Sequence, residues 1–64
     1  MAHVRIRFYR EKKGMTRAEL AAAIGVSEAE IMAYEGHFES PKLDKAIAIA
    51  EALGVTLADL VREV

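Results

Sequence analysis

A six-residue pattern that marks the start of a helix occurs three times in this 64-residue chain. In each copy a hydroxyl residue follows an apolar residue, an acid stands three positions later, and a second apolar residue comes next. The hydroxyl and the acid suit a capping box, and the two apolar residues suit a hydrophobic staple. The copies are 15–20, 26–31 and 55–60, so helices are predicted to begin after Thr16, Ser27 and Thr56.

Glycines and apolar spacing complete an all-α prediction with no strand. Gly14, Gly25, Gly36 and Gly54 each follow a predicted helix as its stop. Ser40 is expected to cap the fourth helix, with Pro41 in its first turn. The apolar residues of that helix recur at helical spacing, at Leu43, Ala46, Ile47, Ala50 and Leu53. The expected helices cover about 4–13, 17–24, 28–35, 41–53 and 57–63.

Only Gly25, Val26 and Ser27 separate the second and third predicted helices. A link this short forces the two helices to cross at a large angle, which is the helix-turn-helix geometry. The residues expected to face the core of this unit are Leu20, Ala21, Ile24, Val26, Ile31 and Tyr34.

The composition predicts a single small domain with a thin core. The chain has no cysteine, so neither a disulfide nor a thiolate metal site can reinforce it. No run approaches the roughly 20 apolar residues of a membrane span, and a soluble cytoplasmic protein is expected. Regular caps and abundant alanine are typical of a thermostable natural domain and equally of a designed one.

Charge is distributed unevenly along the chain, although the net charge is only −1. Residues 1–17 carry six basic residues and one acid, whereas residues 18–64 carry three basic residues and nine acids. The sequence therefore predicts either a basic binding segment on an acidic body or a solvated helix face.

No pattern typical of an enzyme is found. His3 and His37 lie far apart, and neither has metal-ligand spacing around it. The chain contains no phosphate-binding loop and no glycine-rich dinucleotide motif. We therefore expect no catalytic site, no metal and no cofactor.

Four short segments follow one another in the order that they have in a known protein family: Lys13-Gly14-Met15-Thr16, Glu19-Leu20-Ala21, Ile24-Gly25-Val26-Ser27 and Ala52-Leu53-Gly54-Val55. In this order the chain resembles the Xre/Cro-like helix-turn-helix family of phage repressors and small bacterial regulators. The resemblance implies a five-helix repressor-like DNA-binding domain. It also implies a sequence-specific transcriptional regulator, typically a repressor, which binds as a dimer with helix 28–35 in the major groove. Arg10 and Glu35 match positions that form an ion pair between the first and third helices of such proteins.

The resemblance places a DNA-facing set on the second, third and fourth helices: Arg17, Ser27, Glu28, Ala29, Met32, Ala33 and Lys42. Similar proteins often hold Gln at the position of Arg17. They hold Gln, Arg, Lys, Ser or Thr on the outer face of the third helix, where this chain has an acid and two alanines. Glutamate can accept from cytosine N4, and alanine can contact a thymine methyl, but both are weaker than bidentate contacts.

Two further surfaces are predicted from exposed apolar residues. A homodimer interface is expected on the fifth helix and the end of the fourth, through Leu57, Leu60, Val61 and Val64. The alternative to double-stranded DNA binding is a protein-interaction module on the same fold, with Phe8, Met32 or Phe38 contacting a protein partner.

Overall fold

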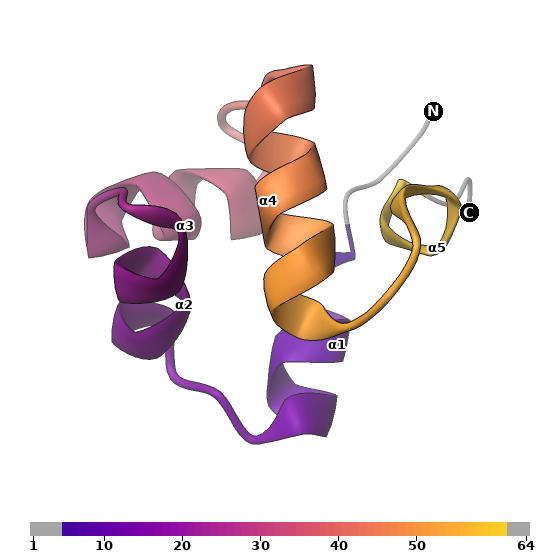
Figure 1. The fold of residues 1–64 in the computed structure, drawn as a ribbon. Coiled ribbons are helices and arrows are strands. Elements are labelled where there is room, and N and C mark those ends of the chain that lie inside the picture. The colour runs from indigo at the N-terminus through magenta and orange to yellow at the C-terminus, as the bar shows by residue number, and fades with distance from the viewer. Residues whose placement is uncertain (1–4, 62–64) are drawn as a thin grey trace.

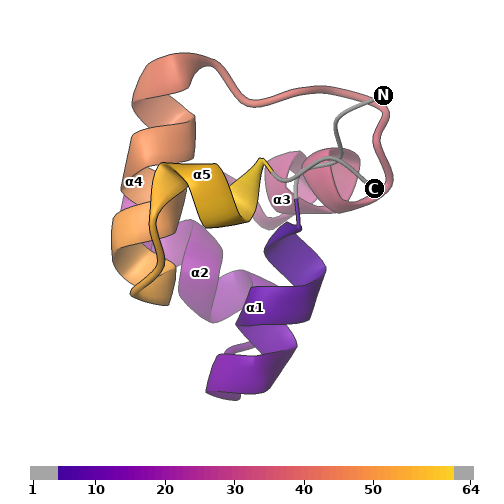
Figure 2. The same cartoon turned by 90° about the vertical axis from the view of Figure 1, so that its right-hand side faces the viewer.

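The computed structural model describes residues 5–61, which form five helices around one core. In Figure 1, α4 stands at the centre, with α2 and α3 on one side, α5 on the other and α1 below. Figure 2 shows the end of α5 close to the start of α1, where the Arg5 amide donates to the Leu60 carbonyl at 2.7 Å. The helices are α1 (Ile6–Lys13), α2 (Arg17–Ile24), α3 (Glu28–Glu35), α4 (Leu43–Leu53) and α5 (Leu57–Leu60).

The bounds of α2 and α3 are those that the sequence predicts, and the other three helices are shorter within the described range. The predicted cap at Ser40 is wrong, because Lys42 is the N-cap of α4 and has extended backbone angles. Pro41 therefore lies in the loop before the cap. Helix α5 ends at Leu60, with Val61 as its C-cap. Residue 4 of the predicted first helix and residues 62–64, including the predicted interface residue Val64, lie outside the described residues.

The two threonine caps form complete capping boxes. Around Thr16, the Glu19 amide donates to the Thr16 hydroxyl at 3.0 Å, and the Thr16 amide donates to the Glu19 carboxylate at 2.8 Å. Thr56 and Asp59 repeat this arrangement at α5. At α3 only half of the box is present, because the Glu30 amide donates to the Ser27 hydroxyl at 3.1 Å while the Glu30 carboxylate accepts elsewhere.

The core draws one or more large apolar side chains from every helix. The fully buried ones are Ile6, Leu20, Ile31, Ile49 and Leu60. Helical spacing of apolar residues does not by itself identify the buried face of α4, since Leu43 and Ile47 are 66% and 43% exposed, whereas Ile49 is fully buried in the core. The side of α4 that faces the core carries Ala46, Ile49, Ala50 and Leu53. No helix within the described range is long and apolar enough to cross a bilayer.

Candidate nucleic-acid interface

Helices α2 and α3 form a compact unit around the turn at Gly25. Gly25 has φ +75° in the left-handed region, which an L side chain adopts only with strain. The Val26 amide donates to the Ala21 carbonyl at 3.0 Å and closes the end of α2. Leu20 and Ile31 are buried between the helices, and the small Ala21 lets the helices approach closely. These contacts hold one face of α3 against the core and leave its other face outward.

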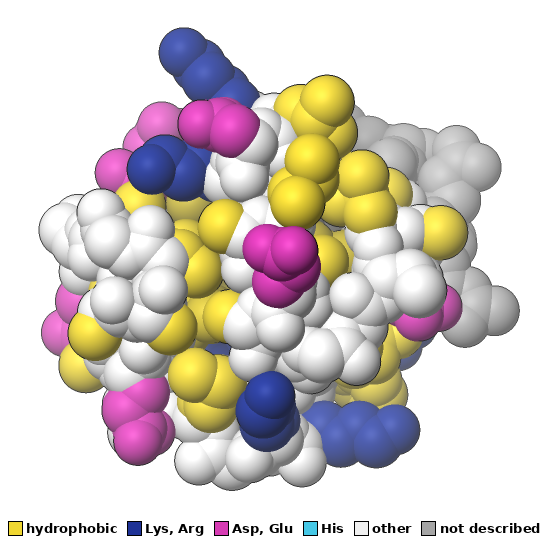
Figure 3. Space-filling view, viewed as in Figure 1, with side chains coloured by type: hydrophobic (Ala, Val, Ile, Leu, Met, Phe, Trp, Pro, Cys, Tyr) yellow, Lys and Arg dark blue, Asp and Glu magenta, His cyan; other side chains and the backbone are white. Residues whose placement is uncertain are grey.

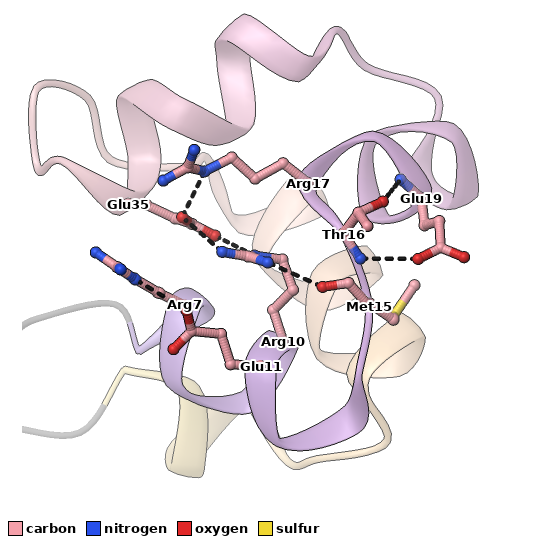
Figure 4. Close-up of polar contacts among 8 residues, drawn as sticks. All are labelled: Arg7, Arg10, Glu11, Met15, Thr16, Arg17, Glu19 and Glu35. Carbon is pink, nitrogen blue, oxygen red and sulfur yellow. Dashed lines mark hydrogen bonds and ion pairs between the residues drawn. The ribbon is translucent and has the colours of Figure 1, made fainter.

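The inner face of α3 carries Glu35, which is the centre of an ion cluster (Figure 4). Arg10 Nε and Nη2 donate to its two carboxylate oxygens at 2.6 and 3.2 Å, so the predicted ion pair is present and bidentate. Arg10 Nη1 also donates to the Met15 carbonyl at 2.8 Å. The side chains of Arg10 and Glu35 are 9% and 3% exposed. This cluster ties α3 to α1 and to the α1–α2 loop.

Ionisation of this cluster follows from its geometry. Burial of Glu35 opposes its charge, but the hydrogen bonds and charges of Arg10 and Arg17 outweigh burial and lower the pKa of Glu35. The hydrogen bond to Glu35 is the main reason why the pKa of Arg10 is raised, against the effect of burial. Arg10 and Glu35 are therefore both charged at neutral pH.

Arg17, which the sequence analysis assigned to DNA, also contacts this cluster. Its Nε donates to Glu35 Oε1 at 2.9 Å, and its side chain is 37% exposed. Figure 4 shows its guanidinium group reaching from the start of α2 to the end of α3. Its terminal nitrogens make none of the hydrogen bonds found within residues 5–61. One edge of the group is thus held by Glu35, and the other remains available to a ligand.

The outer face of α3 brings together the residues predicted to meet DNA. Glu28 and Ala29 are exposed, Met32 is 51% exposed, and Ala33 is half-buried. Ala29, Met32 and Ala33 lie at helical spacing on the side away from the buried Ile31 and Tyr34, and Glu28 lies one turn before Met32. Ser27 stands just before them, and its hydroxyl caps the helix. The face is a small, mainly apolar surface with one carboxylate at its amino-terminal end.

Lys42 lies apart from this face, at a shallow cleft between the end of α3 and the start of α4. Three acids and a second lysine share the cleft with it, so Lys42 is not in a basic patch. The residues lining the cleft are Glu30, Tyr34, Glu39, Ser40, Lys42, Asp44 and Lys45.

The sequence analysis missed two contacts of the site. The Tyr34 hydroxyl donates to Glu30 Oε2 at 2.6 Å, and burial together with this bond raises the pKa of Tyr34 to about 12. The spacing of four between Glu30 and Tyr34 was a usable signal, because such pairs are neighbours on a helix. The bond from Arg17 to Glu35 spans 18 positions, and nothing local in the sequence indicates it.

A family model described as helix-turn-helix matches residues 6–60. The chain belongs to the Xre/Cro-like helix-turn-helix family. It is 36% identical over 59 residues to the cryptic phage CTXphi transcriptional repressor RstR of Vibrio cholerae. That match covers 92% of this chain and 53% of RstR, so the chain spans about half the length of that relative.

Solved structures of the helix-turn-helix family have the same fold. The P22 c2 repressor, in complex with a synthetic operator, has a TM-score of 0.85 at 29% identity, covering 91% of this chain and 88% of that one. SinR of Bacillus subtilis, a master regulator for biofilm formation solved in complex with DNA, has a TM-score of 0.84 at 27% identity. That match covers 91% of this chain and 94% of the chain in that structure.

This helix-turn-helix domain also exposes apolar residues other than those on the outer face of α3. Phe8 on α1 is 48% exposed and lies under the guanidinium of Arg5, 4.3 Å from the ring centroid. Phe38, after α3, is 86% exposed. Figure 3 shows apolar side chains gathered along the upper part of α4, where Leu43 and Ile47 are exposed.

The predicted dimer residues are split between core and surface. Leu60 is fully buried in the core of one chain and is not available to a second chain. Leu57 is half-buried and Val61 is 39% exposed. Among residues 5–61 no cluster of three or more His, Cys, Asp or Glu side chains could hold a metal ion.

Proposed function

We propose that this chain is the DNA-binding domain of a transcriptional repressor, with α3 lying in the major groove. The observation that carries the proposal is the α2–α3 unit, which is fixed on its inner side and open on its outer side. In helix-turn-helix proteins the second helix of the unit enters the major groove and presents its amino-terminal residues to base edges. Relatives with this fold are repressors or regulators solved with DNA, which supports the same role here.

The proposed contacts follow from where each group lies. Glu28, Ala29, Met32 and Ala33 face the bases, and the Ser27 hydroxyl reaches a phosphate beside the start of α3. Arg17 contacts a second phosphate through the edge of its guanidinium that Glu35 leaves open. Lys42 adds a longer and weaker contact, because three acids line the same cleft. With so few cations, affinity is modest and falls steeply with salt.

Binding to random-sequence duplex DNA over a salt series, followed by fluorescence anisotropy, tests this proposal. Arg17→Ala is expected to weaken binding and to reduce the slope of log K against log salt by about 0.9. Arg7→Ala is the matched control, because it removes the same charge from an exposed site on α1. An unchanged slope in Arg17→Ala excludes Arg17 from the phosphate contacts. Absence of binding at low salt contradicts the proposal as a whole.

A homodimer is part of the proposal, because two copies double the phosphate contacts and place two α3 helices about one DNA turn apart. The apolar groups available for it are Leu57 on α5, Val61 directly after α5, and the exposed Leu43 and Ile47 on α4. Sedimentation tests this directly, with Ile47→Lys expected to shift the protein to monomer. A wild-type monomer at high concentration contradicts it.

A protein-interaction module on the same fold is the second candidate. It is favoured by three exposed apolar side chains: Met32 on α3, Phe38 directly after α3, and Phe8 on α1. Under this alternative Glu28→Gln leaves DNA binding unchanged, whereas under the first it strengthens non-specific binding. Neither candidate function involves an enzymatic reaction. As a DNA-binding regulator, the protein would act in the cytoplasm, where bacterial DNA lies.

A further inference from the structure

The outer face of α3 offers almost no hydrogen-bond donor to a base. The eight side chains of α3 are three glutamates, two alanines, Ile31, Met32 and Tyr34. The only hydroxyl donor among them belongs to Tyr34, a residue that is 5% exposed and whose hydroxyl is bonded to Glu30 at 2.6 Å. The exposed part of the helix therefore presents one carboxylate acceptor, at Glu28, and apolar groups.

Base edges in the major groove differ in what they require. Guanine presents two acceptors, N7 and O6, and needs a donor that this helix lacks. Adenine presents an acceptor beside its N6 donor, so a carboxylate that accepts from N6 also faces N7 and is repelled. Cytosine presents the N4 donor, and thymine presents a C5 methyl group. Acceptors and apolar surface thus match the two pyrimidines and neither purine.

We infer that α3 reads pyrimidines, with Glu28 accepting from a cytosine N4 and with Ala29 and Met32 packing on thymine C5 methyl groups. This inference rests on the proposed DNA-binding function. Glu28 and Met32 are four residues apart and lie one turn from each other along the same face, with Ala29 beside them. The helix therefore reaches neighbouring base pairs with one polar and two apolar contacts. Ser27 does not alter the choice, because a hydroxyl can both donate and accept.

The test begins with selection of binding sites from a randomised duplex library. Each enriched thymine is then replaced by deoxyuridine, which removes the methyl group and keeps the base-pairing edge. We expect about a fourfold loss of affinity for each methyl group that α3 covers, the effect of one buried methylene-sized group. Met32→Ala is expected to remove the deoxyuridine effect at one position. Phe8→Ala, a change of another exposed apolar residue on α1, is expected to leave it intact.

Glu28→Gln tests the proposed hydrogen bond between Glu28 and a cytosine N4. Glutamine adds a donor to the acceptor and can bind adenine N6 and N7 together, so selection with this variant should replace the cytosine by adenine. Circular dichroism of Met32→Ala and Glu28→Gln checks that both variants fold.

The outcomes separate this inference from the function on which it rests. Enriched pyrimidines with a deoxyuridine penalty that Met32→Ala removes support it. Tight binding with no deoxyuridine penalty at any position, or enriched guanines whose 7-deaza analogues weaken binding, overturns the inference and leaves DNA binding in place. No enrichment and no binding to any duplex at low salt overturns both.

Discussion

Glu35 and Glu28 stand at opposite ends of α3, one buried and the other exposed, and the fold uses the same side chain in two ways. Glu35 is 3% exposed and accepts hydrogen bonds from Arg10 and Arg17. Glu28 is exposed, and no hydrogen bond or ion pair of its carboxylate is found within residues 5–61. The helix dipole favours an acid at the position of Glu28 and disfavours one at the position of Glu35.

This comparison shows that partners outweigh the dipole. A charge at the unfavourable helix end is retained because two guanidinium groups neutralise it, whereas the favourable helix end leaves its charge to solvent or to a ligand. Glu35 thus determines where α3 lies, and Glu28 takes part in what α3 can bind. Each prediction below changes one of these two acids, or removes the hydrogen bond from Tyr34 to the third acid of the helix, Glu30.

The largest effect is expected from Glu35→Ala, which leaves Arg10 buried without its counter-charge. A loss of about 3 to 5 kcal/mol in the free energy of unfolding is expected, which is close to the whole stability of a domain this small. Urea unfolding followed by circular dichroism measures it. Glu28→Ala is the control and should cost no more than about 1 kcal/mol. Equal losses would show that burial does not separate the two acids.

Lowering the pH should destabilise the fold by protonating the Glu35 carboxylate. Because the pKa of Glu35 is lower in the folded than in the unfolded chain, its contribution is complete above the ordinary value of 4.5 and is lost as the pH falls below it. Urea midpoints measured from pH 7 down to pH 2 should fall in this window. The loss should persist in Glu28→Gln and should be reduced in Glu35→Gln. The reverse pattern would contradict the assignment.

A smaller effect is expected from Tyr34→Phe, which removes the bond to Glu30. Hydrogen bonds to charged groups contribute about 1.5 kcal/mol or more, so a loss of that size is expected in urea unfolding. Burial first, and then the bond to Glu30, raise the pKa of Tyr34 to about 12. Neutral Tyr34 therefore stabilises the fold fully below its ordinary pKa of 10, and this contribution is lost as the pH rises toward 12. The variant should lose less stability than the wild type over this range.

The smallest effect on the fold is expected from Glu28→Gln, with a change of about 0.5 kcal/mol or less in the free energy of unfolding. Its effect should appear in DNA binding, because one negative charge near the phosphates is removed. Non-specific affinity at low salt should rise by an amount corresponding to about 1 kcal/mol or less, and Glu28→Lys should extend the trend. Anisotropy with random duplex DNA measures both variants, and unchanged affinity would favour the protein-partner alternative.

Local signals in the sequence determined most of the helix-turn-helix unit. Thr16, Ser27 and Thr56 begin their helices as predicted, because a cap satisfies backbone amides only a few residues away. Gly25 ends α2 in the left-handed conformation for an equally local reason. The pairing of Arg10 with Glu35 came from family resemblance and is not encoded in local spacing.

Only the tertiary structure decided which residues of α4 and α5 are buried and what Arg17 contacts, since these features depend on how the helices pack together. The spacing of apolar residues along α4 allows more than one face, and packing selected Ile49 for the core while leaving Leu43 and Ile47 exposed. Leu60 is buried because α5 returns to pack on α4 and its end meets the start of α1. Arg17 is held by Glu35 because the start of α2 lies beside the end of α3. Caps and turns act over a few residues and can be predicted from the sequence, whereas burial depends on the positions of all five helices.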